Sequence, residues 1–240
     1  MRAYHNALAQ PRPHSQSTPV WLFDLDNTLH NASNGIFAAI DGRMTQTIAE
    51  LLDLDTTKAD WLRRHYWQRY GATLIGLHRH HQIDAHEFLH RCHDFDIAPL
   101  LSAETQAAAL LQRLPGQKIV FTNAPLHYAL QVVQQLGLLP VVEGVWSMEH
   151  MYLQGQFRPK PSKQLLQQLL ARLPVPAQQV ILVEDTLRNL KSAKQLGLQT
   201  VHRYHAGTPY SALHRGRSPY VDLRVESLRE LAQRYHQLKI

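Results

Sequence analysis

Residues 20–28 read VWLFDLDNT, an apolar run of four residues that passes abruptly into a polar loop. Four residues are too few for a helix, and the abrupt change is typical of a buried β-strand that ends at Phe23. Similar short runs recur further along the chain, at 118–122, 180–183, 200–204 and 221–225. We therefore expect five buried strands.

Segments with helical periodicity lie between and after these runs, at 126–136, 162–173, 187–196 and 227–238. The first and third of them end in Gln-Leu-Gly-Leu, which places Gly137 and Gly197 where a helix takes a left-handed C-terminal cap. Alternation of strands and helices favours a parallel sheet with helices on both faces. The expected fold class is α/β.

Between the first two strands the pattern is helical almost throughout, with helices predicted at 36–52, 56–70, 72–80, 84–90 and 104–114. An insertion directly after the first strand would lie over the carboxyl ends of the strands, where open α/β sheets bind their ligands. We therefore expect a flexible tail at 1–19, a core formed by 20–32 and 115–240, and a helical cap at 33–114.

The composition, 44% hydrophobic and 18% charged, is typical of a folded protein. The single cysteine, Cys92, cannot form an intramolecular disulfide, which favours a reducing, cytoplasmic setting. The net charge of +6 comes from lysines and arginines scattered in ones and twos, so we expect no nucleic-acid partner. We expect no membrane association either, because the first nineteen residues lack the apolar segment of a signal peptide and no run is long enough to span a bilayer.

Two acidic pairs follow predicted strands. Asp24 and Asp26 flank one residue, so both side chains can reach the same crevice, and two such carboxylates stay ionised together only if a cation compensates them. Otherwise one of them holds a proton that it can donate. Glu184 and Asp185 would bring a second pair to the same edge of the sheet, and clustered carboxylates with waters suit Mg²⁺. Alternatively, these residues are ordinary turn and helix-capping groups.

Thr122, Asn123 and Lys160 are candidates for binding an anion. A hydroxyl, an amide and the N–H groups of a helix start make an anion cradle at 122–123, although a plain helix cap explains the same residues. Lys160 stands between Pro159 and Pro161, which restrict the backbone and present the ammonium in few ways. Such a lysine suits a dianionic phosphate, and the alternative is a solvated loop lysine.

In chain order, Asp24-X-Asp26-X-Thr28, Thr122, Lys160 and Glu184-Asp185 resemble the four motifs of the haloacid dehalogenase-like hydrolase superfamily. The helical insertion after the first motif is similar to that superfamily's first cap type, on a Rossmann-like core. More narrowly, four patterns resemble its pyrimidine 5'-nucleotidase branch: Asp-Asn-Thr-Leu-His at 26–30 with Ile36-Phe37 following, Tyr70-Gly71-X-X-Leu74-X-Gly76-Leu77, Arg158-Pro159-Lys160-Pro161, and Glu184-Asp185-X-X-Arg188-Asn189.

The resemblance implies catalytic and metal-binding roles. Asp24 would attack phosphorus and form an aspartyl-phosphate, while Asp26 would protonate the leaving oxygen and then activate water. The Asp24 carboxylate, the Asp26 carbonyl and Asp185 would hold Mg²⁺. Glu184 would reach the metal through water, and Asn189 stands where many relatives have another aspartate.

The resemblance also implies that Thr122, Asn123 and Lys160 bind the phosphoryl group, whereas His30 occupies a position where relatives often have tyrosine. The expected protein is a Mg²⁺-dependent phosphatase of small phosphomonoesters, specifically pyrimidine nucleoside 5'-monophosphates, acting as a monomer or homodimer. Two alternatives stay open. One is a phosphatase of sugar phosphates or phosphoglycolate, and the other is a catalytically silent protein that binds a phosphorylated metabolite.

Overall fold

The computed structural model describes residues 18–70, 72–206 and 218–239. The chain divides into two compact units, which are described separately. The core unit combines the residues up to Ser33 with those from Leu101 onward, and the helical unit comprises Asn34–Leu100. Most of the tail expected at 1–19 lies outside the described residues.

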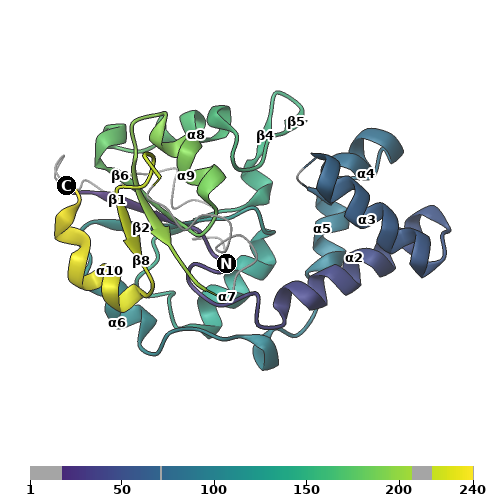
Figure 1. Cartoon of the computed structure of the whole chain (residues 1–240), viewed down its shortest axis with the longest axis horizontal. Coiled ribbons are helices and arrows are strands. Elements are labelled where there is room, and N and C mark those ends of the chain that lie inside the picture. Colours follow the sequence, from purple (N-terminus) through teal and green to yellow (C-terminus); the bar gives the residue numbers. More distant parts are fainter. Residues whose placement is uncertain (1–17, 71, 207–217, 240) are drawn as a thin grey trace. The chain divides into compact units, whose positions relative to one another are not determined.

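The core unit is built on a six-stranded parallel sheet of strand order β3-β2-β1-β6-β7-β8 (Figure 1). The strands are β1 (Val20–Phe23), β2 (Gln117–Phe121), β3 (Gly144–Trp146), β6 (Val180–Glu184), β7 (Gln199–Arg203) and β8 (Leu223–Val225). The expected α/β fold with a parallel sheet is confirmed. Because Phe23 lies opposite both Val120 and Val183, β1, β2 and β6 end at the same level.

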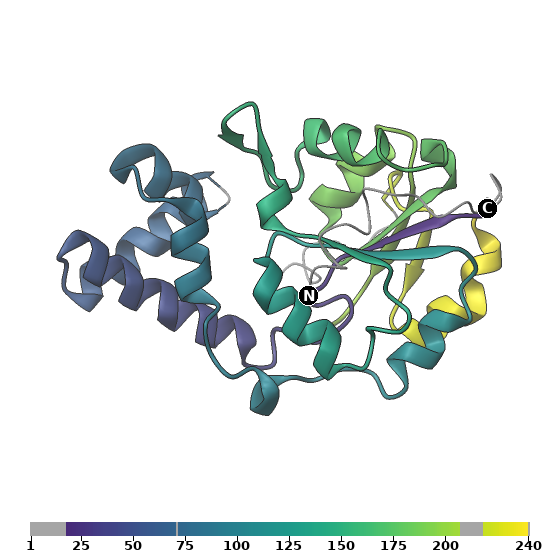
Figure 2. The ribbon, with the colours of Figure 1, turned by 180° about the vertical axis from the view of Figure 1, so that it is seen from behind.

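Helices cover both faces of the sheet. Figures 1 and 2 show α8 (Lys163–Leu170) and α9 (Leu187–Lys194) on one face, with α6 (Ala107–Gln112), α7 (Leu126–Gln135) and α10 (Leu228–Arg234) on the other. A continuous apolar cluster fills the space under α8 and α9; it includes Leu22, Phe121, Leu165, Leu182 and Leu190, all at most 1% exposed. Burial of apolar area on this scale supplies most of the favourable energy of folding.

Several elements differ from the expectations. The edge strand β3 is missing from the sequence-based prediction because its three residues form a strand by pairing with β2, not by any pattern of their own. The same holds for the antiparallel hairpin of β4 (Tyr152–Leu153) and β5 (Gln156–Phe157). The two glycine caps are found as expected, with φ of 66° at Gly137 and 89° at Gly197.

The boundary of the helical insertion also needs a correction. The sequence-based boundary at 114 placed α6 in the cap, whereas the structure assigns α6 to the core unit. The reason lies in packing: Leu110 and Leu111 are buried, and α6 contacts α10. The helical periodicity of this segment does not reveal which unit its apolar face joins.

The helical unit contains α2 (Ile36–Leu52), α3 (Thr56–Tyr70), α4 (Thr73–His81) and α5 (Ala85–Cys92), followed by a 3₁₀ turn at Ala98–Leu100. The close approach of α3 and α4 depends on Gly76, where a Cβ atom would lie 2.2 Å from Cγ of Tyr66. Among the described residues, no helix has the length and apolarity that crossing a bilayer requires.

Candidate active site

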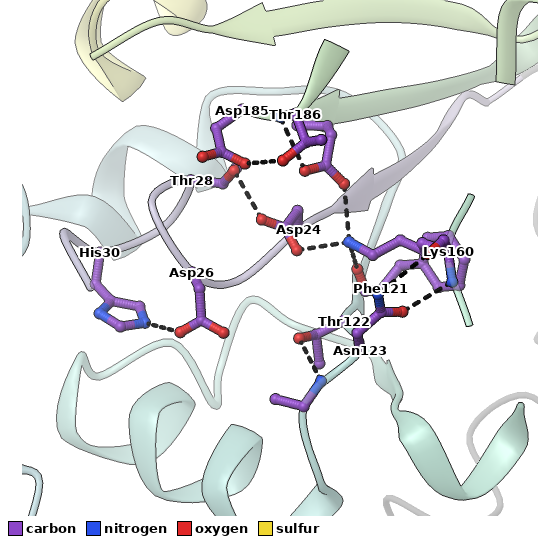
Figure 3. Close-up of polar contacts among 12 residues, drawn as sticks. Asp24, Asp26, Thr28, His30, Phe121, Thr122, Asn123, Lys160, Asp185 and Thr186 are labelled. Carbon is purple, nitrogen blue, oxygen red and sulfur yellow. Dashed lines mark hydrogen bonds and ion pairs between the residues drawn. The ribbon is translucent and has the colours of Figure 1, made fainter. Parts of the chain in front are cut away.

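Asp24 is the first residue beyond β1, and it is 6% exposed. Its amide N–H donates to the carbonyl of Val183 at 2.9 Å, so the sheet still holds the backbone where this side chain begins. Its Oδ1 accepts from Lys160 Nζ at 2.6 Å and its Oδ2 from Thr28 Oγ1 at 3.1 Å (Figure 3). The carboxylate therefore has a fixed orientation on a rigid element.

The loop after Asp24 turns back on itself because of its next residues. Leu25 is fully buried, and its carbonyl accepts from the N–H of Leu29 at 2.9 Å. Asn27 has a φ of 61°, a left-handed conformation that asparagine tolerates better than most residues. Its side chain accepts from the N–H of Ser33 at 3.0 Å, which closes the turn. This turn carries Thr28 to the Asp24 carboxylate.

Lys160 reaches the same place from the loop before α8. Its Nζ donates to Asp24 Oδ1, to Glu184 Oε2 at 2.8 Å and to the carbonyl of Phe121 at 3.0 Å, so its three protons have three acceptors. Its backbone is held by the Asn123 side chain, which accepts from Lys160 N at 2.9 Å and donates to Lys160 O at 3.3 Å. Lys160 is thus a buried, oriented ammonium, and the solvated-loop alternative is wrong.

The second acidic pair lies at the end of β6, as expected. Oxygens of Asp24, Glu184 and Asp185 all lie within 4.8 Å of one another. Glu184 is 1% exposed and accepts from Thr186 N at 3.1 Å, while Asp185 Oδ1 accepts from the Thr186 hydroxyl at 3.0 Å. Three carboxylates therefore lie close together, and the buried ammonium of Lys160 contacts two of them, Asp24 and Glu184.

This charge imbalance displaces the pKa values of the site. Burial, together with the charge of Glu184, raises the pKa of Asp24 to about 7 even though Lys160 acts in the opposite direction. Burial and the charges of Glu184 and Asp24 raise the pKa of Asp185 to about 9. Burial alone would lower the pKa of Lys160, but Asp24 and Glu184 raise it above its ordinary value. The protein alone therefore accommodates the excess negative charge by keeping protons.

The donor set of this cluster fits a magnesium ion. Mg²⁺ takes hard oxygen ligands and keeps several waters, and the cluster offers carboxylate oxygens from Asp24, Glu184 and Asp185 within one small volume. A divalent cation would replace the protons that the raised pKa values of Asp24 and Asp185 imply.

The expected anion cradle at 122–123 is arranged differently from a helix cap. Thr122 is 1% exposed and follows β2, and its hydroxyl accepts from Ala124 N at 3.1 Å. The helix itself is capped by Glu149, whose carboxylate accepts from Leu126 N at 2.9 Å and 3.0 Å. The capping explanation for Thr122 and Asn123 is therefore wrong. The side chain of Asn123 holds the Lys160 backbone, so its peptide N–H is the group it could offer an anion.

Sequence comparison supplies the family. The family model described as haloacid dehalogenase-like hydrolase matches residues 20–197 of the 240. This chain belongs to the haloacid dehalogenase-like hydrolases. The matched range begins at β1 and ends after α9, so it includes every residue of the acidic cluster and Lys160.

Relatives of this haloacid dehalogenase-like hydrolase are distant. Phosphate metabolism protein 8 of Saccharomyces cerevisiae is 24% identical over 191 residues, which are 75% of this chain and 59% of the yeast protein. The chain thus spans less than two thirds of that relative's length.

Solved structures that share its fold include the following three examples. A phosphatase of the same superfamily from Thermococcus onnurineus is similar with a TM-score of 0.64 at 18% identity, over 92% of this chain and 100% of that one. CbbY of Rhodobacter sphaeroides in complex with phosphate is similar with a TM-score of 0.62 at 17% identity, over 93% of this chain and 100% of CbbY. The L-2-haloacid dehalogenase of Xanthobacter autotrophicus is similar with a TM-score of 0.56 at 15% identity, over 91% of this chain and 98% of the dehalogenase.

Within the hydrolase fold, Asp26 has an environment of its own. Its Oδ1 accepts from the Tyr128 hydroxyl at 2.6 Å and lies 2.9 Å from Nε2 of His30. Tyr128 is fully buried, and burial together with the charges of Asp26 and Asp24 raises the pKa of its hydroxyl. Asp26 thus lies two residues after Asp24, and its carboxylate contacts Tyr128 and His30.

Three functional contacts in this hydrolase are not evident from its sequence. Thr28 belongs to the first motif, but only the structure shows that its hydroxyl holds Asp24. His30 stands out in the sequence as a departure from relatives, and a histidine four residues after an aspartate is the available signal for its contact. For the contact of Tyr128 with Asp26 the sequence carries no signal, because Tyr128 lies on α7, 102 positions further along the chain. Asn189 lies in the first turn of α9, and among the described residues its side chain makes no hydrogen bond to the acidic cluster.

Proposed function

We propose that this hydrolase is a phosphatase that cleaves small phosphomonoesters in two steps through an aspartyl-phosphate, an acyl phosphate formed on Asp24. The observation that carries the proposal is the buried Asp24 carboxylate held against Lys160, with a second carboxyl group only two residues away at Asp26. The superfamily's dehalogenases, one of which shares this fold, resemble the chain in the nucleophile but lack the second aspartate. An enzyme that must protonate a leaving oxygen needs that second group.

The proposed first step is a displacement at phosphorus. An oxygen of Asp24 forms a bond to phosphorus as the bond to the leaving oxygen breaks, and Asp26 gives that oxygen its proton. Lys160, the Thr122 hydroxyl and the N–H of Asn123 bind the oxygens of the phosphoryl group. Because the three protons of Lys160 have acceptors already, a phosphoryl oxygen would share this ammonium with Asp24 and approach the nucleophile in doing so.

The proposed second step releases phosphate. Water attacks the phosphorus of the aspartyl-phosphate and Asp26 takes a proton from that water, while the bond between phosphorus and the Asp24 oxygen breaks; this regenerates the Asp24 carboxylate and releases inorganic phosphate. Mg²⁺, when bound by Asp24, the Asp26 carbonyl and Asp185, would supply positive charge against the repulsion between an anionic nucleophile and a dianionic substrate. Thr28, which donates to Asp24, keeps the nucleophile oriented through both steps.

For the substrate we propose pyrimidine nucleoside 5'-monophosphates, of the UMP and CMP type. Four patterns that resemble the pyrimidine 5'-nucleotidase branch support this, including Arg158-Pro159-Lys160-Pro161, which carries the ammonium of the site, and Glu184-Asp185 with Asn189, which carries the metal ligands. A protein similar to this chain, CbbY, has been solved in complex with phosphate. A phosphatase of sugar phosphates or phosphoglycolate is the alternative with the same core chemistry.

A phosphate-release assay tests these proposals together. Protein stripped of metal would be assayed with and without added Mg²⁺ on UMP, CMP, AMP, GMP, phosphoglycolate and p-nitrophenyl phosphate. We expect turnover that requires Mg²⁺ and favours UMP or CMP. A preference for phosphoglycolate or purine nucleotides would refute the proposed substrate but would leave the proposed phosphatase activity intact. No turnover of any of these phosphomonoesters, from protein shown by circular dichroism to be folded, would overturn the phosphatase itself.

A further inference from the structure

Two side chains from different elements converge on one oxygen of Asp26. The Tyr128 hydroxyl donates to Oδ1 at 2.6 Å, and Nε2 of His30 lies 2.9 Å from the same atom. The Tyr128 hydroxyl also lies 3.5 Å from Nε2 of His30, so the three groups form one cluster. The Asp26 side chain is 18% exposed, whereas the His30 side chain is fully buried.

Both partners are rigidly mounted. His30 belongs to the loop that follows Asp24, and its backbone forms an isolated β-bridge with that of Asp26. Tyr128 projects from the buried face of α7, and it is 0% exposed. A carboxyl group held by two buried partners loses the rotational freedom that a partly exposed aspartate otherwise keeps. Asp26 is therefore oriented before any substrate arrives.

The two contacts also determine which oxygen of the Asp26 carboxyl group is held and which is left toward the site. Both contacts end on Oδ1, and Figure 3 shows the other oxygen of Asp26 on the side away from His30, toward Thr122. Thr122 belongs to the region where the phosphoryl group is proposed to lie. A general acid must present its proton within hydrogen-bond distance of the leaving oxygen, so the orientation of this carboxyl group controls protonation.

We propose that Tyr128 and His30 are positioning residues that hold Asp26 by Oδ1, so that Oδ2 carries the proton exchanged with the leaving oxygen and with water. This proposal rests on the proposed phosphatase function. Neither residue touches the reacting atoms, so each acts through Asp26. Substituting Tyr128 or His30 should therefore slow the reaction of substrates whose leaving group needs a proton, and should not slow the reaction of substrates whose leaving group does not.

The experiment compares leaving groups. Wild type and Tyr128→Phe would be assayed with Mg²⁺ on p-nitrophenyl phosphate, which needs little protonation, and on phenyl phosphate and UMP, which need more. We compare kcat/KM, because it reports the steps up to phosphoryl transfer to Asp24 and not the later attack of water, which is the same for every substrate. We expect kcat/KM for the poorer leaving groups to fall about 10-fold, a part of the 10²–10⁴-fold typical of general acids, and kcat/KM for p-nitrophenyl phosphate to change by less than about twofold.

Substitutions of His30 provide a second, independent line. His30→Gln keeps an N–H donor near the position of Nε2 and should retain most of the activity, whereas His30→Phe removes the donor and should reproduce the Tyr128→Phe pattern. If Tyr128→Phe does not fold, this pair carries the test alone. Thr200→Val is the matched control, because it removes a buried hydroxyl bonded to Tyr220 O at 2.8 Å, elsewhere in the sheet. It should leave the leaving-group dependence unchanged.

The outcomes separate this proposal from the proposed function. If wild type hydrolyses phosphomonoesters but Tyr128→Phe and His30→Phe affect all leaving groups equally, or affect none, the positioning role is refuted and the phosphatase stands. The positioning role is also refuted if Thr200→Val changes the leaving-group dependence as much as Tyr128→Phe does. If wild type hydrolyses no phosphomonoester, the phosphatase fails first and the positioning role falls with it.

Discussion

Replacing Lys160 with methionine should destabilise the metal-free protein strongly and in a pH-dependent way. The ammonium contacts Asp24 at 2.6 Å and Glu184 at 2.8 Å, and these three side chains are 3%, 8% and 1% exposed. Removing one partner of a buried ion pair costs about 3–5 kcal/mol, a large part of the roughly 5–15 kcal/mol that holds a typical domain folded. Methionine keeps most of the apolar stem, so the cost is electrostatic.

The loss should depend on whether Asp24 is ionised. Its pKa is about 7 in the presence of Lys160, which lowers it, so without Lys160 the carboxyl group keeps its proton to higher pH. Across the pH range in which the variant holds one more proton than wild type, each unit recovers about 1.4 kcal/mol. The difference between variant and wild type should therefore be largest at high pH, shrink as the pH falls toward 7, and stay constant below 7, where Asp24 is protonated in both proteins.

Urea unfolding followed by circular dichroism, in EDTA at pH 6 and pH 8.5, measures this difference. Lys194→Met is the matched control, because Lys194 pairs with Asp222 at 2.5 Å but both side chains are about one-third exposed. Such a pair contributes roughly 0–1 kcal/mol. If Lys160→Met lost no more than Lys194→Met at pH 8.5, the idea that this ammonium balances a buried acidic cluster would be untenable.

Three further predictions follow from the same contacts. Metal-free protein should lose thermal stability as the pH rises from 3.8 toward about 7, because over this range folded Asp24 still holds a proton that the unfolded chain has lost, and Mg²⁺ should flatten this decline in a melting series. An unchanged decline in Mg²⁺ would count against the metal site. Asp24→Asn should reduce turnover to background and abolish the acid-stable phosphate bound to the enzyme. Asp26→Asn should slow the hydrolysis of UMP more than that of p-nitrophenyl phosphate, and if the two variants had equal effects on both substrates, the separate roles of Asp24 and Asp26 would be rejected. Gly76→Ala should cost roughly 1–3 kcal/mol in urea unfolding because its Cβ would meet Tyr66 at 2.2 Å, while Gly42→Ala, with open space around it, should not destabilise.

The sequence predicted local structure well for physical reasons. Short apolar runs and the helical period are properties of neighbouring residues, so the strands at 20–23 and 180–183 and the helix at 36–52 could be recognised without any knowledge of their partners. Parallel strands in an α/β sheet align their carboxyl ends, and this rule alone brought Asp24 and Glu184 to one edge. The acidic cluster is where that expectation placed it.

Tertiary packing determined the remainder, because those features depend on contacts between residues far apart in the chain. The strand β3 exists through its pairing with β2, and α6 joins the core unit through its contact with α10. The contact between Tyr128 and Asp26 joins residues 102 positions apart, and that between Lys160 and Asp24 joins residues 136 apart. Such contacts form only after the chain has closed long loops and packed its helices on the sheet, so no local pattern encodes them.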